Sequence, residues 1–119
     1  MRTLQVAAAA LVLGTFAGAA AADYVKITKE ADFAALIQQH RLERMGVSLT
    51  VSPDGGITGR AFGRPVTGNW TWQGGYFCRD LAWGERRFDF NCQEVARNGD
   101  ALRFTSDKGN GASAQLYLR

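Results

Sequence analysis

Residues 66–83 read VTGNWTWQGGYFCRDLAW, and this stretch contains the two strands that decide the fold. In its first half, the small and apolar residues Val66, Gly68, Trp70 and Trp72 alternate with the polar residues at 67, 69 and 71. This two-residue period is typical of a strand with one buried face. Gly74-Gly75 predicts a tight turn because glycine tolerates positive φ. A second strand over 76–83 follows at once, so the stretch predicts an antiparallel hairpin.

The same pattern continues in both directions along the chain. It predicts about seven strands, at 47–52, 57–63, 66–72, 76–83, 87–95, 102–104 and 114–118. Turn residues separate them, chiefly Pro53-Asp54-Gly55-Gly56, Gly84-Glu85 and Asn98-Gly99-Asp100, and we expect Arg64-Pro65 to break the second strand from the third. We therefore predict a mainly β fold, an antiparallel meander curled into a small barrel or half-barrel.

One amphipathic helix is expected at about 29–40. Thr28 can cap a helix that starts at Lys29. Apolar and ring-bearing residues then recur at helical spacing, namely Phe33, Leu36, Ile37 and His40. Arg41 and Arg44 suit the C-terminal end of such a helix.

The two cysteines lie 14 residues apart, with Gly84-Glu85 near the midpoint. A hairpin that turns there places Cys78 opposite Cys92, and it also pairs Asp80 with Phe90. A cross-strand disulfide would stabilise the domain by roughly 3 kcal/mol, since it closes a loop of about 15 residues. The alternative is a metal or redox pair, which the absence of CxxC spacing and the presence of one histidine disfavour.

Residues 1–22 have the layout of a secretory signal. Arg2 precedes an apolar run from Leu4 to Ala17, and small residues then lead to Ala20-x-Ala22. We expect cleavage before Asp23 and a single β-rich domain over 23–119. The alternative, an uncleaved anchor, is disfavoured because the run is short and mostly alanine. An exported protein is periplasmic or secreted, and that oxidising compartment agrees with a disulfide.

Charge is dispersed along the chain. Fourteen Lys and Arg residues face 11 Asp and Glu residues, for a net charge of +3, and acids interleave with the arginines. This pattern favours a solvated, lightly basic surface over nucleic-acid binding. After cleavage of the signal we expect no stable membrane insertion.

The 76–83 strand carries the charged candidates for a site. Arg79 shares one face with three apolar side chains, and Asp80 shares the other with Cys78. If Asp80 faces inward it is a ligand-contacting acid in the barrel mouth, with Arg60 as a possible partner. The alternatives are a structural ion pair, or a bulge that turns Asp80 outward.

Three tryptophans are the aromatic candidates. Trp70, Trp72 and Trp83 could line a pocket for a flat or sugar-like ligand, or they could simply be core. His40 with Asp32 and Ser48 does not suffice for a catalytic set. Because the glycine-rich segments near 55–59 and 109–111 do not lead into a helix, they are not phosphate loops. We expect no catalytic residue, no metal and no cofactor.

Most of the chain after the helix resembles a group of small exported proteins from alphaproteobacteria. The stretches that carry the resemblance are SLTVSPDGGITGRAFGRPVTGNWTWQGGYFCRDLAWG, NCQEV and FTSDKGNGASAQLYLR. Members of that group often carry the label dihydrodipicolinate reductase. Reductases of that name use a dinucleotide-binding domain and a separate substrate domain, and this chain has neither the Gly-rich motif nor the length. We therefore interpret the resemblance as support for fold and location, and the label as mistaken.

These observations predict an exported, disulfide-braced binding module for a small ligand or a periplasmic protein partner. The alternative is an enzyme, either the labelled reductase or an unrecognised hydrolase. NADPH binding tests the reductase alternative, because a reductase of that kind requires it.

Overall fold

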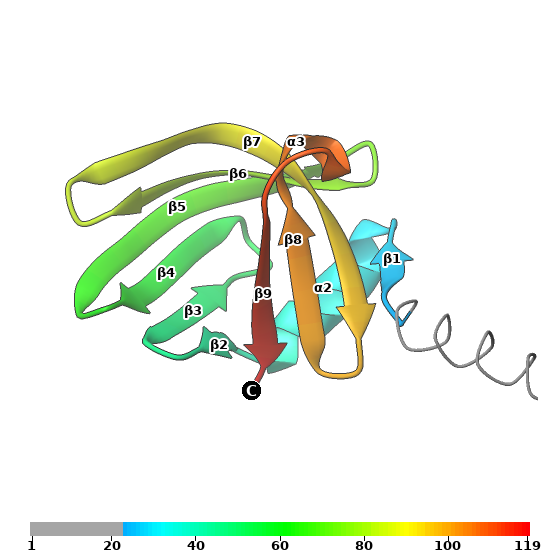
Figure 1. Cartoon of the computed structure of the whole chain (residues 1–119), viewed down its shortest axis with the longest axis horizontal. Helices are drawn as coiled ribbons and strands as arrows, with labels where there is room; N and C mark the ends of the chain where they lie inside the picture. Colours follow the sequence, from blue (N-terminus) through cyan, green and yellow to red (C-terminus); the bar gives the residue numbers. More distant parts are fainter. Residues whose placement is uncertain (1–22) are drawn as a thin grey trace, which may run out of the picture.

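The computed structural model describes residues 23–119, and the predicted signal segment 1–22 lies outside the described residues. Most of the described chain is β-structure (Figure 1). The strands are β1 (Val25–Ile27), β2 (Leu42–Arg44), β3 (Val47–Val51), β4 (Gly56–Ala61), β5 (Arg64–Gln73), β6 (Tyr76–Trp83), β7 (Arg86–Asn98), β8 (Ala101–Thr105) and β9 (Ser113–Leu118). The helices are α2 (Glu30–Gln39) and the short α3 (Ser106–Gly109).

The sheet closes into an antiparallel barrel of eight strands. Its order is β7-β6-β5-β4-β3-β2-β9-β8, and β8 pairs back onto β7 to complete the ring. The extra strand β1 pairs with the last part of β7. The predicted barrel is confirmed, although β1 and β2 were absent from the seven expected strands. Both have only three residues, too few for a two-residue period to be visible in the sequence.

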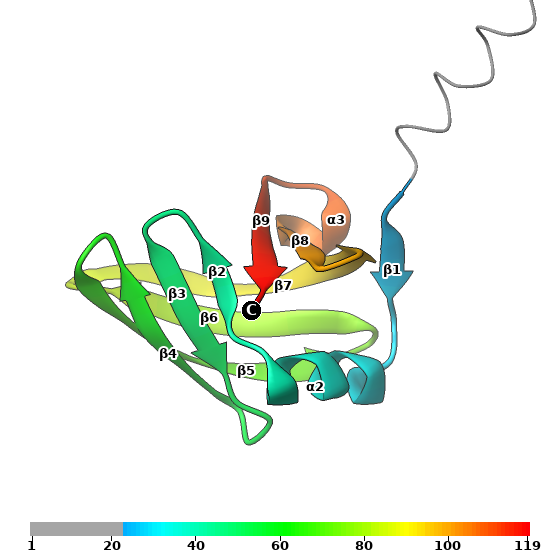
Figure 2. The same cartoon turned by 90° about the horizontal axis from the view of Figure 1, so that it is seen from below.

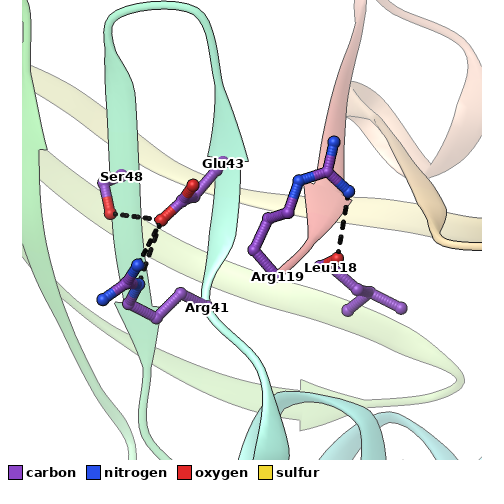
Figure 3. A network of polar contacts seen from close by, with 5 residues as sticks. All are labelled: Arg41, Glu43, Ser48, Leu118 and Arg119. Atoms are coloured by element: carbon purple, nitrogen blue, oxygen red, sulfur yellow. Dashed lines mark hydrogen bonds and ion pairs between the residues drawn. The ribbon is translucent and has the colours of Figure 1, made fainter.

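The pairing of β2 with β9 is the step that joins the two ends of the meander. Leu42 lies opposite Leu118, and the main chains of Arg41 and Arg119 exchange two hydrogen bonds beyond the last strand residues. On the outer surface, Glu43 accepts hydrogen bonds from Arg41 and from the Ser48 hydroxyl on β3, as Figure 3 shows. The seam is thus held by backbone pairing with an exposed polar network beside it.

One wall of the barrel is only partly paired. In the described chain, Arg86–Gln93 of β7 has a strand partner on the β6 side alone, because β8 pairs only with Glu94–Asn98. The short helix α3 covers part of this gap. Asn91 and Asp107 exchange two hydrogen bonds of 2.8 Å, and Gln93 donates to the Ser106 hydroxyl at 3.2 Å. The connection from β8 to β9 therefore folds back on β7 through α3 and covers part of the open wall.

Helix α2 lies across one end of the barrel, away from the turns that join β4 to β5 and β6 to β7 (Figure 2). Its fully buried Phe33 stacks on Trp72 at 5.1 Å and meets Trp70 edge-on at 5.5 Å. The predicted apolar stripe is confirmed. The predicted Thr28 cap is wrong, since the residue at the N-cap is Lys29 and no side chain caps the helix. Neither described helix is long and apolar enough to cross a bilayer.

The break expected at Arg64-Pro65 lies two residues earlier. Phe62 and Gly63 form a two-residue hairpin turn with positive φ at both positions, 50° and 79°. Arg64 and Pro65 belong to β5, where Pro65 lies opposite Arg60. Proline is tolerated there because it is the second residue of the strand, next to the turn.

The predicted disulfide is confirmed. Cys78 and Cys92 are bonded and lie directly opposite each other on β6 and β7. Beyond them the expected register fails by one residue, because a β-bulge lies between Arg79 and Leu81. Trp83 consequently pairs with Arg86 rather than with Arg87, and Asp80 has no direct partner on β7. A bulge of this kind adds one residue to one strand, which turn positions alone do not reveal.

Candidate functional site

The interior of the barrel is built from alternate residues of each strand. On β5 the predicted inward set is confirmed, since Val66 and Trp70 are buried while Thr67, Asn69 and Thr71 are exposed. On the neighbouring β6, Phe77, Arg79 and Leu81 line the interior. Because β6 also alternates, Cys78, Asp80 and Ala82 face outward.

An apolar cavity of about 260 Å³ occupies the middle of the barrel. Aliphatic and aromatic side chains form most of its wall, and Arg44, Arg79 and Gln93 are its polar exceptions. The other lining residues are Leu42, Val47, Leu49, Val51, Ile57, Phe77, Leu81, Phe104, Ala114 and Leu116. No acidic residue lines this cavity, so its charged groups are both cationic.

A second apolar cavity, of about 230 Å³, continues the first toward the end of the barrel that lies opposite α2. The two cavities share three lining residues, Val47, Leu49 and Leu81. Trp83 and Phe62 contribute to the outer part. The barrel therefore contains an apolar path that runs from the core to its turn-bearing end.

Arg79 is one of the two charged residues that line the first cavity, and it is half-buried. Its Cα lies between Trp70 on β5 and Asn91 on β7, and its Nη1 donates a 3.0 Å hydrogen bond to the main-chain oxygen of Asp89. Burial lowers the pKa of the Arg79 guanidinium, and the negative charge of Asp80 opposes that shift. The guanidinium stays charged, since arginine does not lose its proton in proteins. Neither of the two ion pairs found in residues 23–119 includes Arg79.

Asp80 does not contribute to the interior, and its predicted position opposite Phe90 on the inward face is wrong. The side chain is half-buried on the outer surface, where it lines a polar pocket with Asn69 and Arg87. Its Oδ1 accepts a 3.3 Å hydrogen bond from the Asn69 N–H. Asp80 faces outward because β6 alternates without interruption and its Arg79 face is the inner one. The predicted bulge is present, but its extra residue lies on β7 opposite Asp80, so it does not cause the outward position.

The three tryptophans have different positions. Trp70 is 5% exposed, and its Nε1 donates to the Ser52 carbonyl at 2.8 Å. Trp72 is half-buried against α2. Trp83 is half-buried at the end of the barrel opposite α2, and its Nε1 donates to the Ala61 carbonyl at 2.8 Å. Trp70 and Trp72 are thus parts of the core, and only Trp83 lines a cavity wall.

Arg60 lies apart from the interior. It is exposed on β4, and its guanidinium donates to the main-chain oxygen of Gly63. The structure thus brings neither Asp80 nor Trp70 to Arg60. Of the predicted site residues, it places Arg79 and Trp83 on connected cavities.

Sequence reasoning missed two polar residues that line the cavity, the exposed Arg44 and the buried Gln93. Arg44 was assigned to the end of the helix, but α2 ends at Gln39 and Arg44 lies on β2, lining the cavity. Gln93 is 8% exposed, and it is the one buried polar residue of the described chain. The sequence analysis grouped Cys78 with Asp80 and left open which face of that strand was inside, so it did not identify Gln93 as an interior residue.

Residues 23–119 contain no group of three or more His, Cys, Asp or Glu side chains placed to hold a metal ion. A scan against protein-family models found no match for the chain, and neither the curated proteins nor the solved structures include a significant match. The resemblance to the exported alphaproteobacterial group therefore stays a prediction.

Proposed function

We propose that this protein is an exported carrier or sensor that binds a small apolar molecule with an anionic group, such as an aliphatic or aromatic carboxylate. The observation that supports this most directly is the Arg79 guanidinium, which faces an apolar cavity and has no carboxylate partner among the described residues. A small eight-stranded barrel has an interior of the size that holds one such ligand.

The charge of Arg79 favours an anion over a neutral ligand. Partial burial of a cation costs free energy unless a counter-ion or several hydrogen bonds compensate it. Arg79 makes one hydrogen bond, to the carbonyl of Asp89, so most of its donors remain available. A ligand carboxylate could accept two of them in a bidentate arrangement.

The rest of the cavity favours an apolar body. Its walls are aliphatic and aromatic, and the adjoining cavity extends them beyond Leu81. Volumes of about 260 Å³ and 230 Å³ are near the lower end for ligand sites, which favours a slender molecule. Export, which the N-terminal segment predicts and the disulfide agrees with, would place this binding in the periplasm or outside the cell.

Calorimetric titration with decanoate and with decanol tests this function, because the two ligands share a chain and differ in charge. Decanoate should bind more tightly than decanol to the unaltered protein. In Arg79→Met the preference should fall by roughly 10- to 100-fold, the worth of about 1.5–3 kcal/mol for a hydrogen bond to a charged group. The exposed Arg97→Met is the matched control and should keep the preference.

Three results would overturn the proposed function. They are no saturable binding of either ligand, an unchanged preference in Arg79→Met, and an equal loss in Arg97→Met. NADPH belongs in the same titration, because its binding in place of decanoate would support the reductase alternative.

A further inference from the structure

Three hairpin turns meet at the end of the barrel opposite α2. They join β2 to β3 (Met45-Gly46), β4 to β5 (Phe62-Gly63) and β6 to β7 (Gly84-Glu85), and they gather at one end of the molecule in both Figure 1 and Figure 2. The Phe62 N–H donates to the Gly46 carbonyl at 2.7 Å, and the Phe62 ring lies 6.4 Å from that of Trp83. We call this end of the barrel, residues 44–46, 60–64 and 83–87, the turn end.

Two large apolar side chains project from the turn end into solvent. Met45 is 92% exposed and Phe62 is 66% exposed, and they are two of the four exposed large hydrophobic residues in the described chain. They lie next to each other, since the Phe62 ring covers Gly46. An exposed apolar pair on neighbouring turns marks a contact surface more often than a scattered single residue does.

The backbone of the turn does not favour phenylalanine at position 62. The residue has φ of +50°, a left-handed conformation that bulky side chains seldom adopt. In two-residue hairpin turns with positive φ at both positions, asparagine followed by glycine is the preferred pair. Position 63 has the glycine, but position 62 has an exposed aromatic where asparagine would suit the backbone better. The contact with Trp83 involves one part of the ring, and the remaining exposed part is available for a contact outside the fold.

The charge around these two side chains has one sign. The turn end contains five arginines and one acid, and the basic residues are Arg44, Arg60, Arg64, Arg86 and Arg87, with Glu85 as the acid. Neither ion pair of the described residues involves any of them. The turn end therefore has a net charge of +4, although the whole chain has only +3.

We propose that the turn end docks on an anionic lipid surface. Arginines attract the phosphate headgroups, while Met45 and Phe62 enter the boundary between headgroups and acyl chains. A second copy of this chain is a poor occupant, because two surfaces of +4 repel each other. The apolar cavity beneath Phe62 and Trp83 reaches this end, so docking would also place its mouth against the lipid. Docking does not require the interior ligand, and it goes beyond the proposed function.

Co-sedimentation with vesicles tests this docking. The protein, purified after export, is mixed with vesicles of phosphatidylcholine alone or of phosphatidylcholine with phosphatidylglycerol, at low and at high salt. We expect binding only to the vesicles that contain phosphatidylglycerol, and we expect salt to weaken it because exposed charges are screened.

Phe62→Asn separates docking from folding. It should change the melting temperature little, because the better fit of asparagine to the turn offsets the lost ring contact with Trp83, and it should lower vesicle binding roughly tenfold through the loss of aromatic burial. The double variant Arg86→Gln/Arg87→Gln should lower binding about 25-fold, from about fivefold for each arginine near an anionic surface. The control is Arg97→Gln/Lys108→Gln, which removes the same charge from exposed positions outside the turn end and should bind nearly as well as the unaltered protein.

Several outcomes would overturn the docking. They are no sedimentation with anionic vesicles, full binding by Phe62→Asn, equal losses in the two double variants, or recovery of an acidic protein partner at this end without any vesicle binding. Arg79→Met should sediment normally with the vesicles. Failure of ligand binding and failure of docking are therefore observed separately.

Discussion

Replacing Trp70 with alanine should nearly unfold the domain. Trp70 is 5% exposed, and its ring lies within 5.6 Å of the rings of Phe33 and Phe77. Truncation removes those contacts, leaves a cavity beneath α2 and takes away the hydrogen bond to the Ser52 carbonyl. Such a change in a core costs about 3–5 kcal/mol, out of the roughly 5–15 kcal/mol by which a small domain is stable.

The expected fall in melting temperature follows from that cost. For a domain of about 100 residues each kcal/mol shifts the midpoint by about 4–8 °C, so a loss of about 4 kcal/mol lowers it by roughly 15–30 °C. Circular dichroism during heating and in urea measures both quantities. Trp70→Phe keeps the ring contacts but loses the indole N–H, and it should cost only about 1–2 kcal/mol.

Thr71→Ala is the matched control on the same strand. Thr71 is exposed on the opposite face, so its truncation should change the stability by less than about 0.5 kcal/mol. Small and equal effects of Trp70→Ala and Thr71→Ala would refute the inward register of β5. An intact fold with lost ligand binding in Trp70→Ala would instead make Trp70 part of the site rather than of the core.

Other measurements test the disulfide, the strand packing and the acid stability. Replacing Cys78 and Cys92 together by alanine should cost about 3 kcal/mol in urea unfolding, and a double variant as stable as the unaltered protein would contradict the bracing role. Gly68→Ala should cost about 1–3 kcal/mol because a new Cβ would meet a main-chain carbonyl of β6, whereas Gly56→Ala should be nearly neutral; equal melting temperatures would argue against this close approach. A hydrogen bond with the Ser52 side chain, and then one with a backbone N–H, lower the pKa of Asp54. The stabilising effect of its carboxylate is therefore present at neutral pH and is lost as pH falls through the lowered pKa. Asp54→Asn should lose less stability than the unaltered protein between neutral and strongly acidic pH, and identical pH profiles would contradict this expectation.

Local pattern in the sequence was sufficient for the parts of the fold that depend on neighbouring residues. The alternation around Trp70 identified the buried face of β5, because a one-residue slip would reverse every side chain. The spacing of Cys78 and Cys92 about a turn predicted their pairing to within one residue, and the β-bulge supplies the one-residue shift that places them directly opposite each other. The apolar stripe at Phe33 similarly identified the helix face that enters the core.

The candidate site depended on contacts between distant segments, which local pattern does not contain. Strand alternation grouped Arg79 apart from Asp80, but it did not tell which face was inside. The tertiary structure decides which face is inside. It places β6 between β5 and β7 and packs Phe77 and Leu81 into the core. The sequence also did not reveal the bulge opposite Asp80. The turn at Gly84-Glu85 and the pairing of Cys78 with Cys92 have registers that differ by one residue, and the bulge accommodates this difference.

The short strands and the turn end show the same division. Val25–Ile27 and Leu42–Arg44 are strands only because longer strands offer them hydrogen-bonding edges. The sequence contains ten arginines after residue 22, but they are spread along the chain, so the sequence alone does not indicate a basic patch. Folding brings five of them to one end because successive hairpins place alternate turns at the same end of a barrel, and this physical proximity is a property of the tertiary structure alone.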